Sequence, residues 1–83
     1  MSNGIKIPRC TKFSPLRRRL KRFQIHWDES KGKGGHGSFV GPHKITRQIQ
    51  AYTLPSSQTR EVHIVYIKGL MERFGLTPED LFQ

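Results

Sequence analysis

The chain has 83 residues, one cysteine and a formal net charge of +9. This length suits one small domain, and a single cysteine, Cys10, excludes an intrachain disulfide and fits a reducing cytoplasm. The longest apolar run, residues 64–67, is too short to cross a bilayer, and residues 1–8 lack the apolar stretch of a signal peptide. We therefore expect a cytoplasmic protein without a membrane partner.

The positive charge is concentrated in the N-terminal half. Residues 1–47 contain twelve Lys or Arg and two acidic residues, whereas residues 48–83 contain three Lys or Arg and four acidic residues. A solubilising surface usually mixes the two signs. A basic field confined to one part of a small domain indicates a polyanionic partner, most simply nucleic acid.

The first segment, residues 1–13, shows no helical period and mixes isolated apolar residues with basic ones. This pattern predicts a basic N-terminal arm. The rest of the chain, residues 14–83, contains neither an internal repeat nor a linker. We expect this second part to form a single domain.

A first helix is predicted to begin at Ser14, because serine favours the N-cap and proline, here Pro15, favours the first helical position. Apolar residues follow at helical spacing: Leu16, Leu20 and Phe23. Five of the six residues 17–22 are cations. Their repulsion disfavours an isolated helix, so we expect tertiary contacts or a bound polyanion to compensate, with at least two of the five touching phosphate.

Three short strands are predicted next. Residues 24–29 alternate, with Ile25 and Trp27 on one face. A Gly/Lys loop leads to a second strand at residues 38–40, and a third strand at residues 45–54 ends before a proline. Such short connections favour an antiparallel meander.

Residues 60–74 are compatible with a strand, because they are rich in β-branched residues, or with a helix. Five apolar residues share one helical face: Tyr66, Ile67, Leu70, Met71 and Phe74. We predict a helix that ends at Gly75, followed by a short turn capped by Thr77. The expected fold is therefore α+β, in the order α-β-β-β-α, with two helices on one face of a three-stranded antiparallel sheet.

The Gly/Lys loop, residues 31–38, combines four glycines, two lysines and one histidine. Glycine lets the backbone approach a partner closely, and histidine exchanges protons near neutral pH. A solvated hairpin loop with a bystander histidine has the same composition, so the loop alone does not decide its role. Zinc-ligand spacing, paired carboxylates and a Walker-type loop are missing from the sequence, and we expect no metal or cofactor.

The basic first helix, the Gly/Lys turn that ends in histidine and the final Gly75-Leu76-Thr77 together resemble the HicA toxin family. The resemblance covers roughly residues 14–82. Members of that family have a double-stranded-RNA-binding-domain-like fold and act as mRNA interferases, and a HicB antitoxin covers their active site. The resemblance implies the same fold and partners here.

The family's Gly-Ser-His segment at the start of the second strand is matched by Gly34-Gly35-His36, which implies a catalytic role for His36. Gly35 stands in place of the family's serine, and Gly37 in place of a second histidine found in many members. The Val-Pro pair that ends the family's third strand is matched by Leu54-Pro55.

The resemblance thus implies the toxin of a type II toxin–antitoxin system, a metal-independent endoribonuclease that cleaves mRNA with His36 as general acid or base. RNA supplies its own nucleophile, the 2′-OH. Its expected partners are mRNA and a HicB-like antitoxin. Auxiliary catalytic candidates are Lys31, Lys33, Ser38 and His43. RNA-binding candidates are Arg17, Arg18, Lys21, Arg22, Lys31, Lys33 and Arg47.

Two other functions stay open. The departures at Gly35 and Gly37 are compatible with a non-catalytic RNA-binding module of the same fold, and the charge alone is compatible with a small basic protein associated with nucleic acid. Among the other histidines, His26 is a further candidate for the same sheet face as His36. His63 is expected to be structural, and the two aromatic residues Trp27 and Tyr52 are expected to pack in the core rather than stack on bases.

Overall fold

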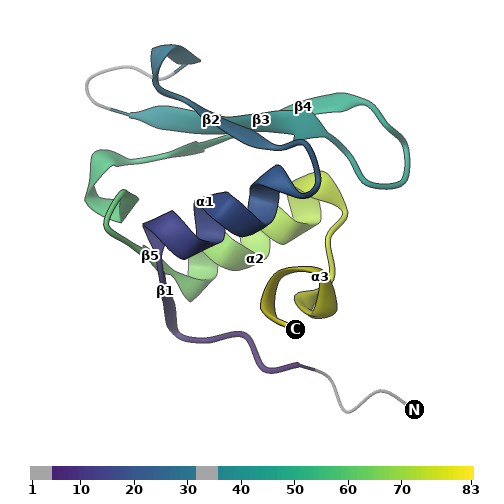
Figure 1. Cartoon of the computed structure of the whole chain (residues 1–83). Coiled ribbons are helices and arrows are strands. Elements are labelled where there is room, and N and C mark those ends of the chain that lie inside the picture. Colours follow the sequence, from purple (N-terminus) through teal and green to yellow (C-terminus); the bar gives the residue numbers. More distant parts are fainter. Residues whose placement is uncertain (1–4, 32–35) are drawn as a thin grey trace.

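The larger of two sheets contains three antiparallel strands in the order β2-β3-β4: β2 (His26–Asp28), β3 (Gly37–Pro42) and β4 (Ile49–Leu54). The computed structural model describes residues 5–31 and 36–83. Two helices, α1 (Phe13–Lys21) and α2 (Ile64–Phe74), lie on the same face of this sheet (Figure 1). The α+β class and the antiparallel meander predicted from the sequence are confirmed.

A second, two-stranded sheet pairs β1 (Cys10–Lys12) with β5 (Glu61–His63), with Thr11 opposite Val62. The backbone N–H of Phe13 also donates to the carbonyl of Arg60 at 2.9 Å, and the Phe13 side chain is buried. The predicted boundary between an arm and a domain at residue 14 therefore leaves out part of the domain. Three residues are too few to show a strand period, and their pairing partner lies about fifty residues along the chain.

The start of α1 also differs from the prediction. Lys12 is the N-cap residue and makes no side-chain capping bond, while Ser14 and Pro15 lie inside the first turn. The helix begins earlier because Phe13 packs edge-on against Trp27, with ring centroids 5.0 Å apart. Leu16 and Leu20 are fully buried, as the apolar spacing predicted.

The hairpin between β3 and β4 shortens the predicted third strand. The N–H of His43 donates to Gln48 at 2.7 Å, and the N–H of Arg47 donates to His43 at 3.0 Å. Arg47 adopts a positive φ of 67° inside this turn. Residues 45–48 therefore form the turn and not the strand, and β4 begins at Ile49.

The segment at residues 60–74, whose sequence is compatible with a strand or a helix, contains one of each. Residues 61–63 form β5, where the helix prediction is wrong, and α2 follows from Ile64. The predicted helical face is confirmed by complete burial of Ile67, Leu70 and Phe74. At its end Gly75 is left-handed, with φ 69°, and the N–H of Leu76 reaches the carbonyl of Met71 at 2.9 Å.

A short third helix, α3 (Pro78–Phe82), follows, and two 3-10 turns complete the elements: η1 (Glu29–Lys31) and η2 (Ser56–Gln58). Thr77 and Asp80 form a reciprocal capping box at the start of α3. Leu81 is buried, so α3 closes one end of the core. The additional helix and the second sheet go beyond the predicted order.

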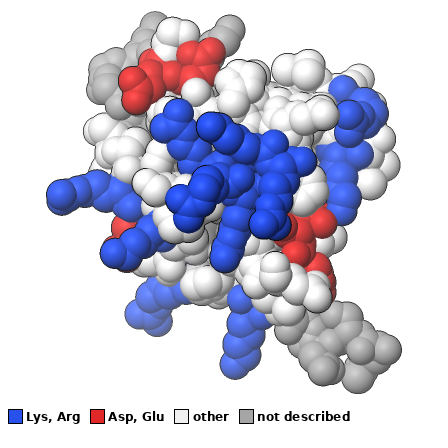
Figure 2. Space-filling view, viewed as in Figure 1, with Lys and Arg blue, Asp and Glu red and all other residues white. Residues whose placement is uncertain are grey.

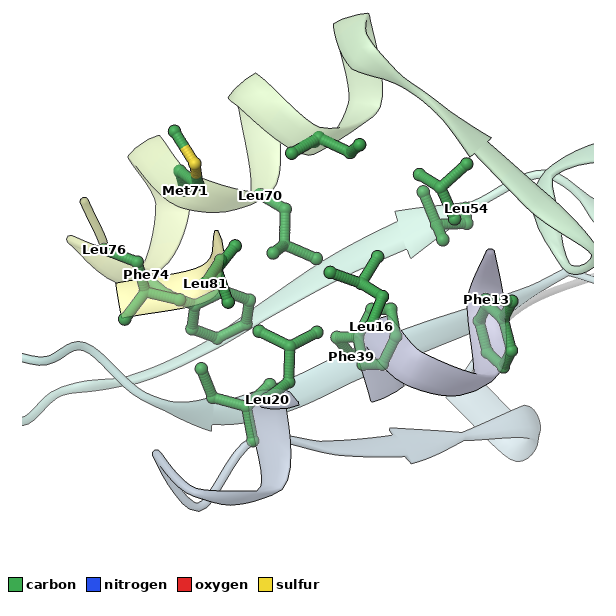
Figure 3. Packing of buried hydrophobic residues seen from close by; sticks show 13 residues of the cluster. Phe13, Leu16, Leu20, Phe39, Leu54, Leu70, Met71, Phe74, Leu76 and Leu81 are labelled. Carbon is green, nitrogen blue, oxygen red and sulfur yellow. The ribbon is translucent and has the colours of Figure 1, made fainter. Parts of the chain in front are cut away.

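The core lies between the sheet and the two long helices, and α3 covers one end of it (Figure 3). Its side chains come from every layer, including Leu16 and Leu20 from α1, Phe39 from β3 and Leu70 and Phe74 from α2. Gly41 lets β3 lie close to the preceding connection, since a Cβ there would come within 2.6 Å of the carbonyl oxygen of Gln24. The inner sheet face is therefore occupied by packing, which leaves the outer face and the helix surfaces for partners.

Candidate active site and nucleic-acid interface

His36 lies immediately before β3, at the end of the sheet where Gly37 pairs with Leu54. Its side chain is partly exposed. Within residues 5–31 and 36–83, the imidazole takes part in neither a hydrogen bond nor an ion pair. Both ring nitrogens therefore remain available to a ligand or substrate.

The glycine after His36 has a structural explanation. A Cβ at Gly37 would collide with the indole ring of Trp27. Trp27 in turn packs edge-on against Phe39, with ring centroids 4.8 Å apart, and against Phe13. This aromatic cluster requires glycine at position 37, and it gives Trp27 the packing role that we expected.

Ser38 is two residues beyond His36, but its hydroxyl is committed. The Ser38 Oγ atom lies 2.7 Å from Thr53 Oγ1 across the β3–β4 pair, and the side chain is only 1% exposed. The turn η1 packs against this part of β3. A cross-strand hydrogen bond thus accounts for Ser38 without an auxiliary catalytic role.

His43 lies at the opposite end of β3. The seven residue steps from His36 to His43 correspond to about 23 Å of extended strand. The Nδ1 atom of His43 accepts hydrogen bonds from the backbone N–H groups of Ile45 at 3.1 Å and Thr46 at 3.2 Å. His43 therefore organises the hairpin turn, and the structure does not bring it to His36. Arg47 belongs to this same distant turn.

The two remaining histidines are His26 and His63. His26 is exposed on β2 opposite Val40, four residues along β3 from His36, or about 13 Å. His63 caps α2, where its Nδ1 accepts the N–H of Val65 at 3.2 Å, which is the structural role expected for it. Neither His26 nor His43 thus lies at catalytic distance from His36.

Several predicted site residues fall in the Gly/Lys loop. Lys33, Gly34 and Gly35 lie outside the described residues. Lys31 ends η1, and its side chain also lies outside the description. Their predicted roles beside His36 stay predictions.

The basic surface of α1 is the largest concentration of charge on the visible face (Figure 2). The four predicted RNA-binding residues of this helix region are all exposed: Arg17, Arg18, Lys21 and Arg22. The fifth cation, Arg19, behaves differently, because its Nη1 donates to the carbonyl of Leu81 at 2.8 Å and its guanidinium lies 5.8 Å from the ring centroid of Phe82. Arg19 is the tertiary contact that ties α3 to α1.

The sequence did not predict that some of these cations share a concavity. A pocket of about 270 Å³ is lined by four residues of α1 and its C-cap: Pro15, Arg18, Arg19 and Arg22. The three arginines follow Pro15 by three, four and seven residues, so all four residues lie in one stripe along the helix. That spacing was readable in the sequence, but the position of Arg19 depends on Leu81, 62 residues later.

One further cation is neutralised by an acidic partner. Lys44 Nζ lies 2.8 Å from both carboxylate oxygens of Asp80. Burial acts to raise the pKa of Asp80, but hydrogen bonds from Lys44 and Thr77 outweigh it, and the pKa lies below its ordinary value. Lys44 therefore fastens the β3–β4 hairpin to α3 and adds little free charge to the interface.

Comparison of the chain with models of protein families, with curated proteins and with solved structures finds no match. Among the helices that the structure describes, none has the length and apolar composition needed to cross a membrane. The function of the chain is therefore inferred from its own residues and their geometry.

Proposed function

We propose that this domain is a HicA-like endoribonuclease, the toxin of a toxin–antitoxin pair, which cleaves mRNA in the cytoplasm with His36 as the general acid or base. The observation that carries the proposal is the contrast among the histidines. His43 and His63 each use Nδ1 to accept backbone N–H groups, whereas His36 is uncommitted beside a glycine-rich segment. The α1, β2-β3-β4, α2 arrangement supports the double-stranded-RNA-binding-domain-like fold that this resemblance implies.

The proposed reaction uses the nucleophile that RNA carries. His36 removes the proton of a 2′-OH, the 2′-oxygen bonds to the adjacent phosphorus, and the bond from phosphorus to the 5′-oxygen breaks. The leaving 5′-oxygen takes a proton from the imidazolium or from water. The products are a 2′,3′-cyclic phosphate and a 5′-OH, and such proton transfer contributes roughly 10²–10⁴-fold to the rate.

The partner expected in this proposal is a HicB-like antitoxin. A protein that restrains the enzyme has to cover His36 and neutralise a basic surface. We therefore expect it to present acidic and apolar residues to this domain. A reading frame of that kind beside the gene would support the assignment.

A second function has its own supporting observation. His26 and His43 are about 13 Å and about 23 Å from His36 along the sheet, so neither can serve as its acid–base partner, and the Nδ1 atom of His63 already accepts a backbone N–H. A double-stranded-RNA-binding-like module without catalysis has no need of such a partner. The two functions differ in whether RNA is cleaved, not in whether it is bound.

The test compares His36→Ala with His26→Ala. Both substitutions remove a histidine side chain that makes no hydrogen bond in the described residues, so neither should unfold the domain. Expression of the wild-type chain and of the His26→Ala variant is expected to arrest growth and degrade transcripts, whereas the His36→Ala variant is expected to do neither while still binding RNA. Equal RNA decay with His36→Ala contradicts the catalytic assignment, and RNA binding without any decay supports the binding module.

A further inference from the structure

The cations of α1 and its C-cap divide into two rows. One row forms the arginine pocket, defined here as Pro15, Arg18, Arg19 and Arg22. The other row is the flanking pair, Arg17 and Lys21, which is exposed and does not line the pocket. At about 100° per residue, the two rows point in directions roughly 130° apart around the helix axis.

We propose that the arginine pocket binds one phosphate group of the RNA backbone at a distance from the scissile bond, an inference that rests on the proposed RNA-directed function. Three arginines line one concavity, and none of its lining residues is acidic. Guanidinium presents its donors in a planar fork that matches the oxygens of a phosphate. The flanking pair attracts RNA only by long-range electrostatics and makes no direct contact with a phosphate.

The pocket is held in shape by contacts outside α1. Arg19 donates to the carbonyl of Leu81 and lies over the ring of Phe82. Leu81 is buried, and α3 is capped by Thr77 and Asp80. One wall of the pocket is therefore built before a ligand arrives, which lowers the entropy lost on binding.

The composition of the pocket favours phosphate over an acidic protein. Its only apolar member is Pro15. Protein interfaces are centred on buried apolar or aromatic anchors with a polar rim, and this pocket has no such centre. RNA phosphates need only convergent donors and positive charge.

The pocket also sets a minimum size for the substrate. Phe13, which contacts the Trp27 ring beside Gly37, is six residues from Arg19, or about 9 Å along the helix axis. The pocket opens on the far side of a helix about 10 Å wide, so a strand that reaches both the pocket and His36 spans roughly 15–20 Å. At the stacked spacing of about 3.4 Å per nucleotide, this distance corresponds to about four to six nucleotides.

The experiment compares Arg18→Gln/Arg22→Gln with Arg17→Gln/Lys21→Gln, both placed in His36→Ala protein so that the RNA stays intact. Each double variant removes two exposed cations four residues apart from the same helix region, so net charge and helix propensity change alike. Binding to a fluorescent RNA of about 12 nucleotides is measured by anisotropy at several salt concentrations. Circular dichroism checks that both variants are folded.

We expect the pocket variant to lose about tenfold in affinity and the flanking variant about threefold or less. Because Arg18 and Arg22 share one phosphate, each single pocket variant should lose nearly as much as the double. The slope of log affinity against log salt should fall by about 0.7 for the double pocket variant, the value for one single-stranded phosphate. Equal losses from the two double variants, or no loss from the pocket variant, overturn the proposal.

These results are separate from the test of cleavage. If the pocket variant binds RNA less well but wild-type protein cleaves none, the pocket is supported and the ribonuclease function fails. If cleavage depends on His36 but both double variants bind alike, the ribonuclease stands and the pocket fails. Binding of an acidic protein that requires Arg18 and Arg22, with RNA binding unaffected, also overturns the phosphate assignment.

Discussion

The two ends of β3 carry the same residue type in opposite circumstances. At one end His36 follows the glycine-rich segment, and its imidazole has no partner in the described residues. At the other end His43 accepts two backbone N–H groups, and its ring fills the space beside Gly75. The hairpin is also fastened by Lys44, whose N–H donates to the carbonyl of Phe74 at 2.8 Å and whose side chain pairs with Asp80.

This difference shows how a histidine's role depends on what its nitrogens already bind. An Nδ1 atom that accepts backbone N–H groups in a packed turn holds the ring in one orientation, which suits a structural role. A partly exposed ring with uncommitted nitrogens can transfer protons to a substrate. His63, the N-cap of α2, also accepts a backbone N–H with its side chain, so we assign it a structural role as well.

The largest expected effect comes from replacing the histidine at each end of β3 with alanine. His36→Ala should lower the rate of RNA cleavage by about 10²–10⁴-fold with the free energy of unfolding nearly unchanged. His43→Ala should do the reverse, with cleavage by folded protein within about threefold of wild type and unfolding easier by about 1–2 kcal/mol, because two N–H groups lose their acceptor. Cleavage assays and urea unfolding measure the two quantities. A loss of cleavage in folded His43→Ala protein would contradict the division.

Gly75→Ala tests whether the His43 ring packs against Gly75 at the hairpin end of β3. The substitution places a methyl group against the His43 ring at a φ of 69°, so we expect a loss of about 2–4 kcal/mol in the free energy of unfolding. In a His43→Ala background the collision is removed, and only the backbone strain of about 1 kcal/mol should remain. Urea unfolding of the four proteins in this cycle gives the coupling. Equal costs in both backgrounds would show that His43 does not pack on Gly75.

Asp80→Asn tests the ion pair that fastens the same end. At pH 7 the variant should lose about 1 kcal/mol, since it weakens the capping box and removes the partner of Lys44. The pKa of Asp80 is depressed in the folded state, so its carboxylate stabilises the fold above its ordinary value of 3.8 and loses that effect as the pH falls through the lower folded value. Thermal unfolding should therefore show a gap between the two proteins at pH 7 that shrinks below pH 3.8. A gap that is constant over this range would rule out the contribution of the carboxylate.

The smallest effect is expected at the His36 end, from Ser38→Ala. Loss of the hydrogen bond to Thr53 should cost only about 0.5 kcal/mol, because Thr53 is exposed and water can replace its partner. Cleavage by the folded variant should stay within about threefold of wild type. A loss beyond tenfold in cleavage without loss of stability would instead give Ser38 a part in the reaction.

The parts of the fold that the sequence predicted well depend on short-range patterns. The buried face of α2 and its end at Gly75 follow from apolar spacing and from a glycine that can adopt a positive φ. The pairing of β1 with β5 and the burial of Phe13 depend on residues far apart in the chain, and no local pattern signals them. The early start of α1 likewise depends on a distant contact, the packing of Phe13 against Trp27.

The candidate site also combines features that local sequence predicts with features that depend on distant contacts. His36 could be selected from its motif, but the sequence could not show that His43, an auxiliary candidate, is structural, because the hydrogen bonds of His43 form only when the turn is closed. The arginine pocket could not be predicted from the sequence for a related reason. Its spacing is local, but Arg19 is oriented by a carbonyl in α3.

The chemical ends of the RNA products test the central claim most directly. If His36 deprotonates a 2′-OH, RNA incubated with the purified wild-type protein should yield fragments that end in a 2′,3′-cyclic phosphate and begin with a 5′-OH, and mass spectrometry should find none above background with the His36→Ala protein. Fragments that begin with a 5′-phosphate, or the same yield of cyclic phosphate from the His36→Ala protein, would contradict the account.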